Sequence, residues 1–310
     1  MFINPLIYEK INSDFAQSRL DVWARHKWSY IPYSSIQKAI RKGFIKVDGK
    51  KAKALSRLHW GSIVSFKENW PVFFYTPQKD REIAPEWVQK LESWIVYEDQ
   101  HILVLNKPNG IACQGGSGQR YHVDGLMQAW RQTDKIRLVH RLDKQTSGLL
   151  ILAKKLNDAR ELSSIFHHRC MKKVYWACVQ GRVPLKGLID TAMERKGRIM
   201  VPSHGDNAQK CLTRYTRKAV TENRSWVEIY PLTGRMHQIR AHMASIGHPV
   251  HGDSMYGPQH HNCQNSPLFL HCRKMSWTMH GRKYSFVAPF PDHFKTCCGY
   301  REEFNKIVLE

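Results

Sequence analysis

The sequence predicts an α+β protein in which a smaller α/β domain precedes the main domain. Short runs of strand length recur along the chain between turn residues, and residues 211–219 and 225–232 alternate as two paired strands do. Amphipathic helical patterns are fewer and lie between these runs. With 310 residues, the chain is long enough for one large domain or two unequal ones, with a substantial core.

Changes in pattern and composition along the chain predict its domain organisation. Residues 1–17 show no clear periodicity, and we expect them to form an N-terminal extension. Residues 18–75 have the patterns of a small basic domain. Residues 76–92 are polar and contain two prolines, which is typical of a linker. We expect residues 93–310 to form the second and larger domain.

The small domain combines short helices with paired strands. One helical pattern begins near Ser18 and a second near Ser34, and Gly43 can end the second. Residues 44–47 alternate as a strand and lead into an Asp-Gly turn, and residues 60–66 can form another strand.

The small domain is also strongly basic. Between residues 18 and 58, eleven Lys or Arg face only two acidic residues. The helical pattern places Lys38, Arg41 and Lys42 on the outer face of the second helix. A solvated helix face is the ordinary explanation of such a run, but an imbalance of this size favours contacts with phosphates. We therefore predict that these three residues bind RNA.

The second domain begins with a pair of strands and continues with alternating strand and helix patterns. Each strand pattern is short and apolar or alternating, and each helical pattern has one apolar face. The expected strands are residues 94–97, 101–105, 148–153, 174–183, 211–219 and 225–232, and the expected helices are residues 157–166 and a helix that follows the turn at 233–236.

One segment of the second domain places charge directly beside a buried strand. Residues 140–154 read HRLDKQTSGLLILAK, and the apolar run from Gly148 onward is of strand length. A charge this close to a core is unfavourable unless it is paired, so we expect Asp143 to be buried with a partner and a function. A loop aspartate that caps a turn, with Thr146 and Ser147 bonded to the backbone, is the alternative.

This segment resembles the HRLDxxTSG signature of the RluA family of pseudouridine synthases. Two later segments also resemble family motifs. Residues 173–181 fit KxYxAxVxG, and residues 233–242 fit TGRTHQIRVH except at Met236 and Ala241. The resemblance extends over about residues 93–292 and implies a catalytic domain built on a mixed, mostly antiparallel sheet. RLDVW, SSIQKAIRKGFIKVDGK and WGSIVSF, in the small domain, resemble the S-four-like RNA-binding domain that often precedes this catalytic domain.

The resemblance implies the catalytic residues. Asp143 would be the catalytic aspartate, and Tyr175 would lie against the target base. Arg240 would be the basic residue that pairs with the aspartate, ideally through two parallel hydrogen bonds. Arg141 would fill the gap left by an extruded uridine. Arg235 is either a phosphate contact or a surface charge, and we predict the former.

The implied reaction breaks the N1–C1′ bond of a uridine, rotates the base and rejoins it through C5. Asp143 would attack C1′ or the base, or would remove a ribose proton, and the sequence does not distinguish these routes. Neither a redox change nor phosphate energy is needed. We expect His237 and His242 to have structural roles.

The composition independently indicates a nucleic-acid partner. The chain contains 48 Lys and Arg against 26 Asp and Glu, for a formal net charge of +22 and an isoelectric point near 9.8. Such a surplus on a folded chain favours a polyanion, and nucleic acid before a membrane. No apolar run approaches eighteen residues, and the eight scattered cysteines contain no CxxC pair, so we expect a cytoplasmic protein with reduced thiols.

We expect neither a metal nor a nucleotide cofactor. The richest metal-like cluster, His260, His261 and Cys263, lacks a second ligand pair at a usable spacing. The Gly-rich run at 115–118 lacks the flanking strand, helix and lysine of a nucleotide site.

The predicted function is therefore isomerisation of uridines in 23S-type ribosomal RNA by a monomer. A transfer-RNA substrate remains an alternative, as does a non-catalytic RNA-binding factor in ribosome assembly. A hydrolytic glycosidase is disfavoured, because sugar cleavage normally uses two positioned carboxylates and the motifs contain one.

Overall fold

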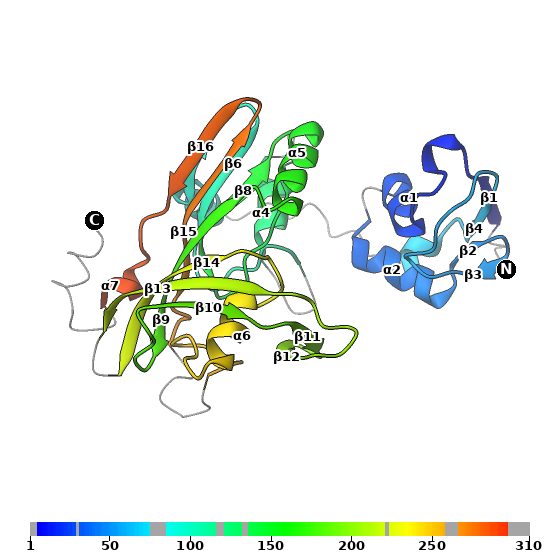
Figure 1. Ribbon diagram of the computed structural model, residues 1–310. Helices are drawn as coiled ribbons and strands as arrows, with labels where there is room; N and C mark the ends of the chain where they lie inside the picture. Colours follow the sequence, from blue (N-terminus) through cyan, green and yellow to red (C-terminus); the bar gives the residue numbers. More distant parts are fainter. Residues whose placement is uncertain are drawn as a thin grey trace. The chain divides into compact units, whose positions relative to one another are not determined.

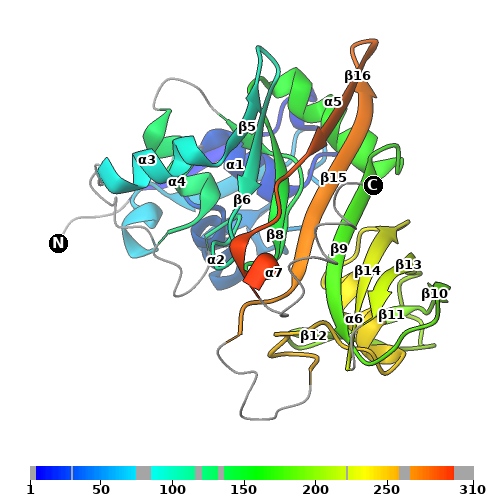
Figure 2. The same ribbon diagram turned by 90° about the vertical axis from the view of Figure 1, so that its left-hand side faces the viewer.

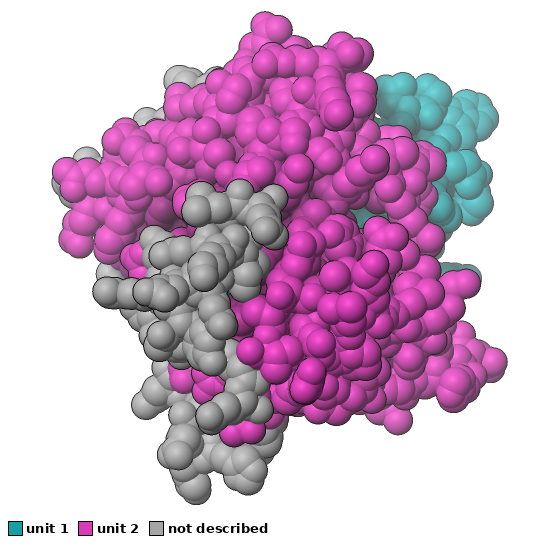
Figure 3. All heavy atoms as spheres, turned by 60° about the vertical axis from the view of Figure 1, so that its left-hand side comes forward, with its two compact units in different colours: residues 1–81 teal, residues 82–310 magenta. Residues whose placement is uncertain are grey.

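The computed structural model describes residues 5–28, 31–74, 85–115, 121–131, 136–220, 223–257 and 266–296. The chain separates into two compact units, residues 1–81 and 82–310, drawn in different colours in Figure 3. Among the described residues, no helix is both long enough and apolar enough to cross a membrane.

Unit 1 is a four-stranded antiparallel sheet with two α-helices (Figure 1). Its core is rich in aromatic side chains, and the rings of Trp23, Phe66 and Trp70 all pack around Trp28. The elements are β1 (Leu6–Lys10), η1 (Ser13–Phe15), α1 (Leu20–Lys27), α2 (Tyr33–Lys42), β2 (Ile45–Val47), β3 (Lys50–Lys51), β4 (Ile63–Lys67) and η2 (Trp70–Phe73), and the strand order is β1-β4-β2-β3.

The structure corrects the prediction that residues 1–17 form an extension. Residues 6–10 form β1, which pairs antiparallel with β4. On the exposed face of β1 lie Leu6 and Tyr8, which are 46% and 66% exposed, while Ile7 and Glu9 share the half-buried face. Because apolar and polar residues are mixed on both faces, the strand has no readable alternation.

The predicted linker at residues 76–92 is also wrong in its second half. Residues Pro85–Ser93 form helix α3, and Leu91 is fully buried in the core of unit 2. Residues 75–84 lie outside the described part of the chain.

Unit 2 is built on one mixed, mostly antiparallel sheet, which confirms the predicted fold class. The strand order is β10-β13-β14-β9-β15-β8-β6-β5, with β16 paired to β15 and β7 paired to β8. Every pairing in this sheet is antiparallel except that of β15 with β8. The strands are β5 (Ile95–Glu98), β6 (Ile102–Lys107), β7 (Arg137–Leu138), β8 (Ser147–Ala153), β9 (Lys172–Gln180), β10 (Lys186–Asp190), β13 (Leu212–Val220), β14 (Arg224–Pro231), β15 (Leu270–Met279) and β16 (Arg282–Val287).

The remaining elements of unit 2 are a separate hairpin and four further helices. They are β11 (Met193–Lys196) and β12 (Ile199–Pro202), and α4 (Val123–Trp130), α5 (Leu156–His167), α6 (Gln238–Ser245) and α7 (Asp292–Thr296).

Strands β9 and β15 run side by side through the middle of the sheet (Figure 2). Two core clusters flank this centre. One contains β6, β8 and residues of α4, and the other contains parts of β9, β14 and α6. Tyr175 of β9 packs against both clusters and therefore lies where the two halves of the sheet meet.

Gly148 allows the single parallel pairing in the sheet. It has φ +108° and pairs with Cys272 of β15, and an added Cβ would overlap the carbonyl oxygen of Cys272. The glycine that ends the HRLDKQTSG segment is thus required by a close approach of two backbones.

Candidate active site

An open pocket of about 1240 Å³ in unit 2 brings the three predicted catalytic residues together. Asp143 comes from the loop between β7 and β8, Tyr175 from β9 and Arg240 from the first turn of α6. These residues are widely separated in the sequence, so the fold of the sheet is what assembles them.

Asp143 lines the pocket from a tight loop. Its backbone carbonyl accepts a hydrogen bond from the amide of Thr146 at 3.1 Å. Its side chain is 27% exposed, so the expectation of a buried acid is wrong, because the carboxylate faces the open pocket. Its partner is as expected: Arg240 Nη1 donates to Asp143 Oδ2 at 3.3 Å.

The two parallel hydrogen bonds of Arg240, however, go to a different carboxylate. Arg240 Nε and Nη2 donate to the two oxygens of Asp253 at 2.7 Å each. The prediction of a bidentate pair between Asp143 and Arg240 is therefore wrong. Asp143 accepts a single hydrogen bond, from Nη1 of the guanidinium. Burial opposes the charge of Arg240, but its hydrogen bond to Asp253 and the charges of both carboxylates raise its pKa above the ordinary value.

Asp253 is a functional residue that sequence reasoning did not identify. Its side chain is fully buried, and Oδ1 also accepts hydrogen bonds from the amides of Met255 and Tyr256 at 2.9 and 3.1 Å. The signal was an acidic residue within the segment HGDSMYG, just after a glycine whose Cβ position is filled by the carbonyl oxygen of Pro267. Its pairing with Arg240 depends on how α6 packs, which the sequence pattern does not encode.

His237 also lies beside Asp143. Its Nε2 is 3.9 Å from Asp143 Oδ1, and its Nδ1 is 3.0 Å from the hydroxyl of Tyr256. It caps α6 from the left-handed conformation, with φ +50°. Burial lowers its pKa below the ordinary value, so the ring is neutral at pH 7. His242 is fully buried and contacts Thr213 and Thr191 instead.

Tyr175 presents its ring to the pocket from the centre of the sheet. Burial, followed by the neighbouring Cys272 thiol, raises the pKa of Tyr175 well above its ordinary value. The phenol therefore keeps its proton at neutral pH. Tyr175 is suited to stacking and to donating a hydrogen bond, and less suited to acting as a base.

Lys107 binds the loop that carries Asp143, and the sequence did not indicate this role. It is fully buried, and its Nζ donates to the carbonyl oxygens of Pro108, Ile111 and Lys144 at 2.9, 2.8 and 3.3 Å. Burial lowers its pKa to about 8, against the opposing charges of Cys113 and Asp143. Its contact with Lys144 fixes the backbone directly after Asp143.

The walls of the pocket are basic. Arg141 and Arg235 both line it and are both exposed, and Arg141 donates to Gln114 at 3.3 Å. Further cations line the same pocket: Arg169, Lys172, Lys173, Arg214 and Lys274.

The other predicted RNA contacts lie in unit 1. Lys38, Arg41 and Lys42 are exposed on α2, whose Ile36 and Ile40 are buried. The structure therefore groups Arg141 and Arg235 with the pocket, and places the three α2 residues on a separate unit.

The structure does not describe most of the two sequence features considered for cofactors. Residues 260, 261 and 263 and residues 116–118 lie outside the described part of the chain. Gly115 is described, and an added Cβ there would meet the ring of His122.

Comparison with known proteins gives consistent similarities. The model of a family described as RNA pseudouridylate synthase matches residues 101–245. The ribosomal large subunit pseudouridine synthase C of Vibrio parahaemolyticus is 35% identical over 253 residues, which cover 80% of this chain and 79% of that protein. The protein of the same name in Rickettsia bellii is 36% identical over 259 residues, covering 80% of this chain and 85% of that protein.

A solved structure shares the fold. Human RNA pseudouridylate synthase domain containing 4 superposes with a TM-score of 0.60 at 22% identity, over 71% of this chain and 95% of that one.

Proposed function

Because the chain belongs to the RNA pseudouridylate synthase family, as its sequence motifs predicted, we propose that it isomerises specific uridines of large-subunit ribosomal RNA to pseudouridine. The observation that carries this proposal is a carboxylate, Asp143, that faces an open basic pocket beside Arg240 and Tyr175. The substrate class is supported by the Vibrio and Rickettsia relatives, which are named for the large ribosomal subunit.

The charges around Asp143 support a role as an ionised carboxylate. Arg240 carries one positive charge between two carboxylates, and Asp253 takes its two shortest hydrogen bonds. Asp143 Oδ2 accepts the third, which leaves Oδ1 directed toward His237 and the pocket. This oxygen is the atom that would attack C1′ or the base, or would remove a ribose proton.

The reaction is balanced without an external reactant. The N1–C1′ bond breaks, the uracil rotates, a C1′–C5 bond forms, and the proton lost from C5 is matched by one that N1 takes up from solvent. Tyr175, whose phenol stays protonated, would stack on the uracil during this rotation.

The target uridine must leave its stack to reach Asp143, at a cost of a few kcal/mol. The exposed Arg141, next but one to the acid, would occupy the gap. Arg235 and the lysines of the pocket wall would hold the flanking phosphates, which fixes the position of the RNA without selecting its sequence.

We propose further that unit 1 is an S-four-like RNA-binding domain and that the enzyme acts in the cytoplasm as a monomer without a nucleotide cofactor. The exposed cations of α2 support the first point.

The test of catalysis is the Asp143→Asn variant. Tritium release from RNA labelled at C5 of uridine should fall to background, while RNA affinity should stay within about threefold of wild type because the amide is isosteric. Asp190→Asn, which removes an exposed carboxylate outside the pocket, is the matched control and should retain full activity. Turnover by the Asp143→Asn enzyme would refute the proposed role.

The test of the substrate is a map of pseudouridines in a strain that lacks the gene. Positions in large-subunit ribosomal RNA should be lost and should return with the wild-type gene but not with the Asp143→Asn gene. If only transfer-RNA positions are lost, the ribosomal substrate is wrong while the enzymatic activity stands.

A further inference from the structure

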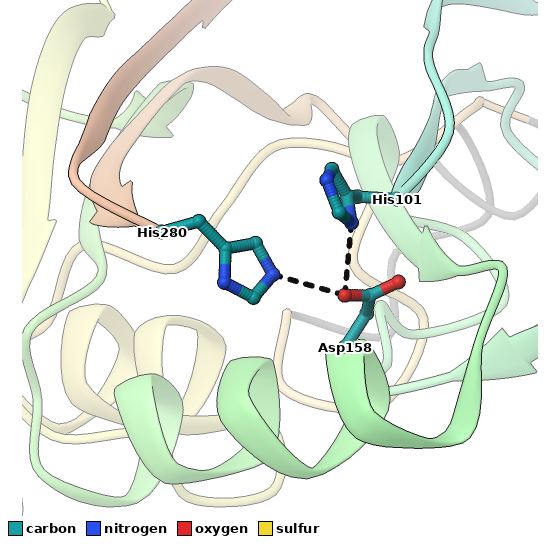
Figure 4. A group of neighbouring side chains, drawn as sticks. All are labelled: His101, Asp158 and His280. Atoms are coloured by element: carbon teal, nitrogen blue, oxygen red, sulfur yellow. Dashed lines mark hydrogen bonds and ion pairs between the residues drawn. The ribbon is translucent and has the colours of Figure 1, made fainter.

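A second cluster of chemically competent side chains lies outside the pocket (Figure 4). His101 precedes β6, Asp158 lies on α5, and His280 lies in the turn between β15 and β16. His101 Nδ1 and His280 Nε2 each lie 3.0 Å from the same oxygen, Asp158 Oδ1. None of the three lines the catalytic pocket.

We propose that His101, Asp158 and His280 form a binding site for one zinc ion. Two imidazole nitrogens and a carboxylate oxygen are a donor set that zinc accepts, and the three ligand atoms lie within 4.8 Å of one another. In a tetrahedral zinc site, ligand atoms are roughly 3.3 Å apart. The two 3.0 Å contacts with Asp158 Oδ1 therefore need to open by a few tenths of an ångström, and the two ring nitrogens, which lie within 4.8 Å of each other, need to reach the same spacing.

The site has both a buried anchor and an entry path. The side chain of Asp158 is 4% exposed, whereas that of His280 is 41% exposed. Zinc can enter from the side of His280 and keep a water molecule as its fourth ligand. Asp158 Oδ2 has no hydrogen-bond partner among the described residues, so this carboxylate is not fully satisfied by the two rings.

The outer nitrogen of each ring has a partner. Glu161, one turn after Asp158 on α5, has Oε2 at 3.1 Å from His280 Nδ1, and its Oε1 accepts from the His280 amide at 3.2 Å. Gln100 Nε2 lies 3.1 Å from His101 Nε2. Partners of this kind orient metal-binding histidines. With zinc bound, the Gln100 amide would turn so that its oxygen accepts the ring proton.

The backbone holds His280 in this position. His280 and Gly281 form a two-residue turn between the paired residues Met279 and Arg282, and both have positive φ, +50° and +72°. Such turns usually begin with Asn, Asp or Gly, so a histidine there is unusual. Together, Asp158 and Glu161 supply two negative charges that match a divalent cation.

The competing explanation is a hydrogen-bonded His–Asp–His network without a metal. It differs in two measurable ways, because such a network predicts no effect of zinc on stability and no dependence of zinc affinity on Asp158.

The experiment uses the tag-free, full-length chain and zinc ion alone, titrated against a chromogenic chelator. We expect one zinc per chain, and saturating zinc should raise the melting temperature by roughly 5 °C. Asp158→Asn, which preserves shape, should weaken binding at least about 100-fold and abolish the thermal shift. Glu161→Gln should weaken binding about tenfold, because it removes only the support of His280.

His168→Ala, which removes an exposed histidine just after α5, is the matched control and should bind zinc as wild type does. Circular dichroism without zinc checks that each variant is folded, and His280→Ala on the exposed turn replaces Asp158→Asn if that variant is not. The proposal is overturned if wild type does not bind zinc, or if it binds zinc no more tightly than Asp158→Asn or its replacement His280→Ala. Because the readouts are affinity and melting temperature, the outcome is independent of catalysis.

Discussion

The guanidinium of Arg240 places one positive charge between the carboxylates of Asp143 and Asp253 at the pocket. It is almost fully buried between Asp253 and Asp143, so its orientation is set by the carboxylate that holds it more tightly. Asp253 does not line the pocket, and its two hydrogen bonds from Arg240 set where the positive charge lies beside Asp143. We therefore expect Asp253 to position Arg240 without contacting the substrate.

We expect Asp253→Asn to lower kcat by about 10- to 100-fold with a change in KM of less than about threefold. The amide can still accept from the backbone of Met255, but it no longer compensates Arg240, so the guanidinium shifts toward Asp143. Breaking a buried pair should also lower the free energy of unfolding by about 3 kcal/mol. Steady-state tritium release at several RNA concentrations gives kcat and KM separately. Asp253→Glu, which restores the charge, should recover part of kcat, and failure of any such recovery would indicate a purely structural loss.

A second residue-scale prediction concerns acid stability. Burial, followed by the charge of Arg273, lowers the pKa of His271 to about 3. An unfolded chain binds that proton near pH 6.5, so between about pH 6.5 and 3 the unfolded state holds more protons and stability falls as pH falls. His271→Phe should flatten the slope of unfolding free energy against pH by about 1.4 kcal/mol per pH unit between pH 6 and 4.

Urea unfolding at several pH values measures this slope. His59→Phe, which removes an exposed imidazole of unit 1, is the control and should leave the slope as in wild type. An unchanged slope in His271→Phe would show that the buried ring does not contribute to acid sensitivity.

The residues of the pocket were predictable to different degrees. Asp143, Tyr175 and Arg240 belong to motifs, and the structure brings them to one pocket. Asp253 and Lys107 act through a fully buried ion pair and through three backbone carbonyls, respectively. Those contacts exist only after distant loops have packed, so the sequence segment HGDSMYG marks Asp253 as a candidate but does not show its pairing with Arg240.

At the scale of elements, strand β8 connects the catalytic loop to the sheet. It begins at Ser147 and pairs in parallel with β15 at Ser147 and Gly148, where the two backbones approach closely. All seven of its residues are buried, which explains why this strand was readable as an apolar run. Strand β1 was missed because it is an edge strand with mixed faces, and no alternation marks it.

Gly148→Ala should lower the free energy of unfolding by more than about 3 kcal/mol, because the added methyl group meets the backbone of Cys272 and the conformation at φ +108° is strained. Gly197→Ala is the matched control. It also has a positive φ, +63°, but open space around the Cβ position, so it should cost only about 1 kcal/mol. Chemical denaturation of both variants measures the difference. Equal losses would mean that backbone strain, and not the close approach of β8 and β15, requires this glycine.

At the scale of the whole molecule, the cations behind the net charge of +22 include two groups that lie on different units. One group lines the pocket of unit 2, and the other is exposed on α2 of unit 1. The composition predicted a polyanion partner correctly in class. It could not separate the two groups, because net charge carries no information on position.

This division predicts how salt acts on binding. Replacing Lys38, Arg41 and Lys42 together with Ala should weaken RNA binding and reduce the slope of log affinity against log salt by about 2 to 3, since each lost phosphate contact removes about 0.7 to 0.9. The rate of the bound complex in single-turnover tritium release should stay within about twofold of wild type, because no group at Asp143 has changed.

The control removes the same charge from other exposed positions, Lys155, Lys186 and Lys283 of unit 2. If general attraction to a positively charged protein explained binding, both triple variants would reduce affinity and salt slope equally. If α2 contacts phosphates directly, only the α2 variant loses the full slope, because counterions are released only where a cation meets the RNA backbone. Filter binding from 50 to 300 mM salt therefore distinguishes a defined RNA-binding face from net charge, and equal slopes for the two variants would reject the role of α2.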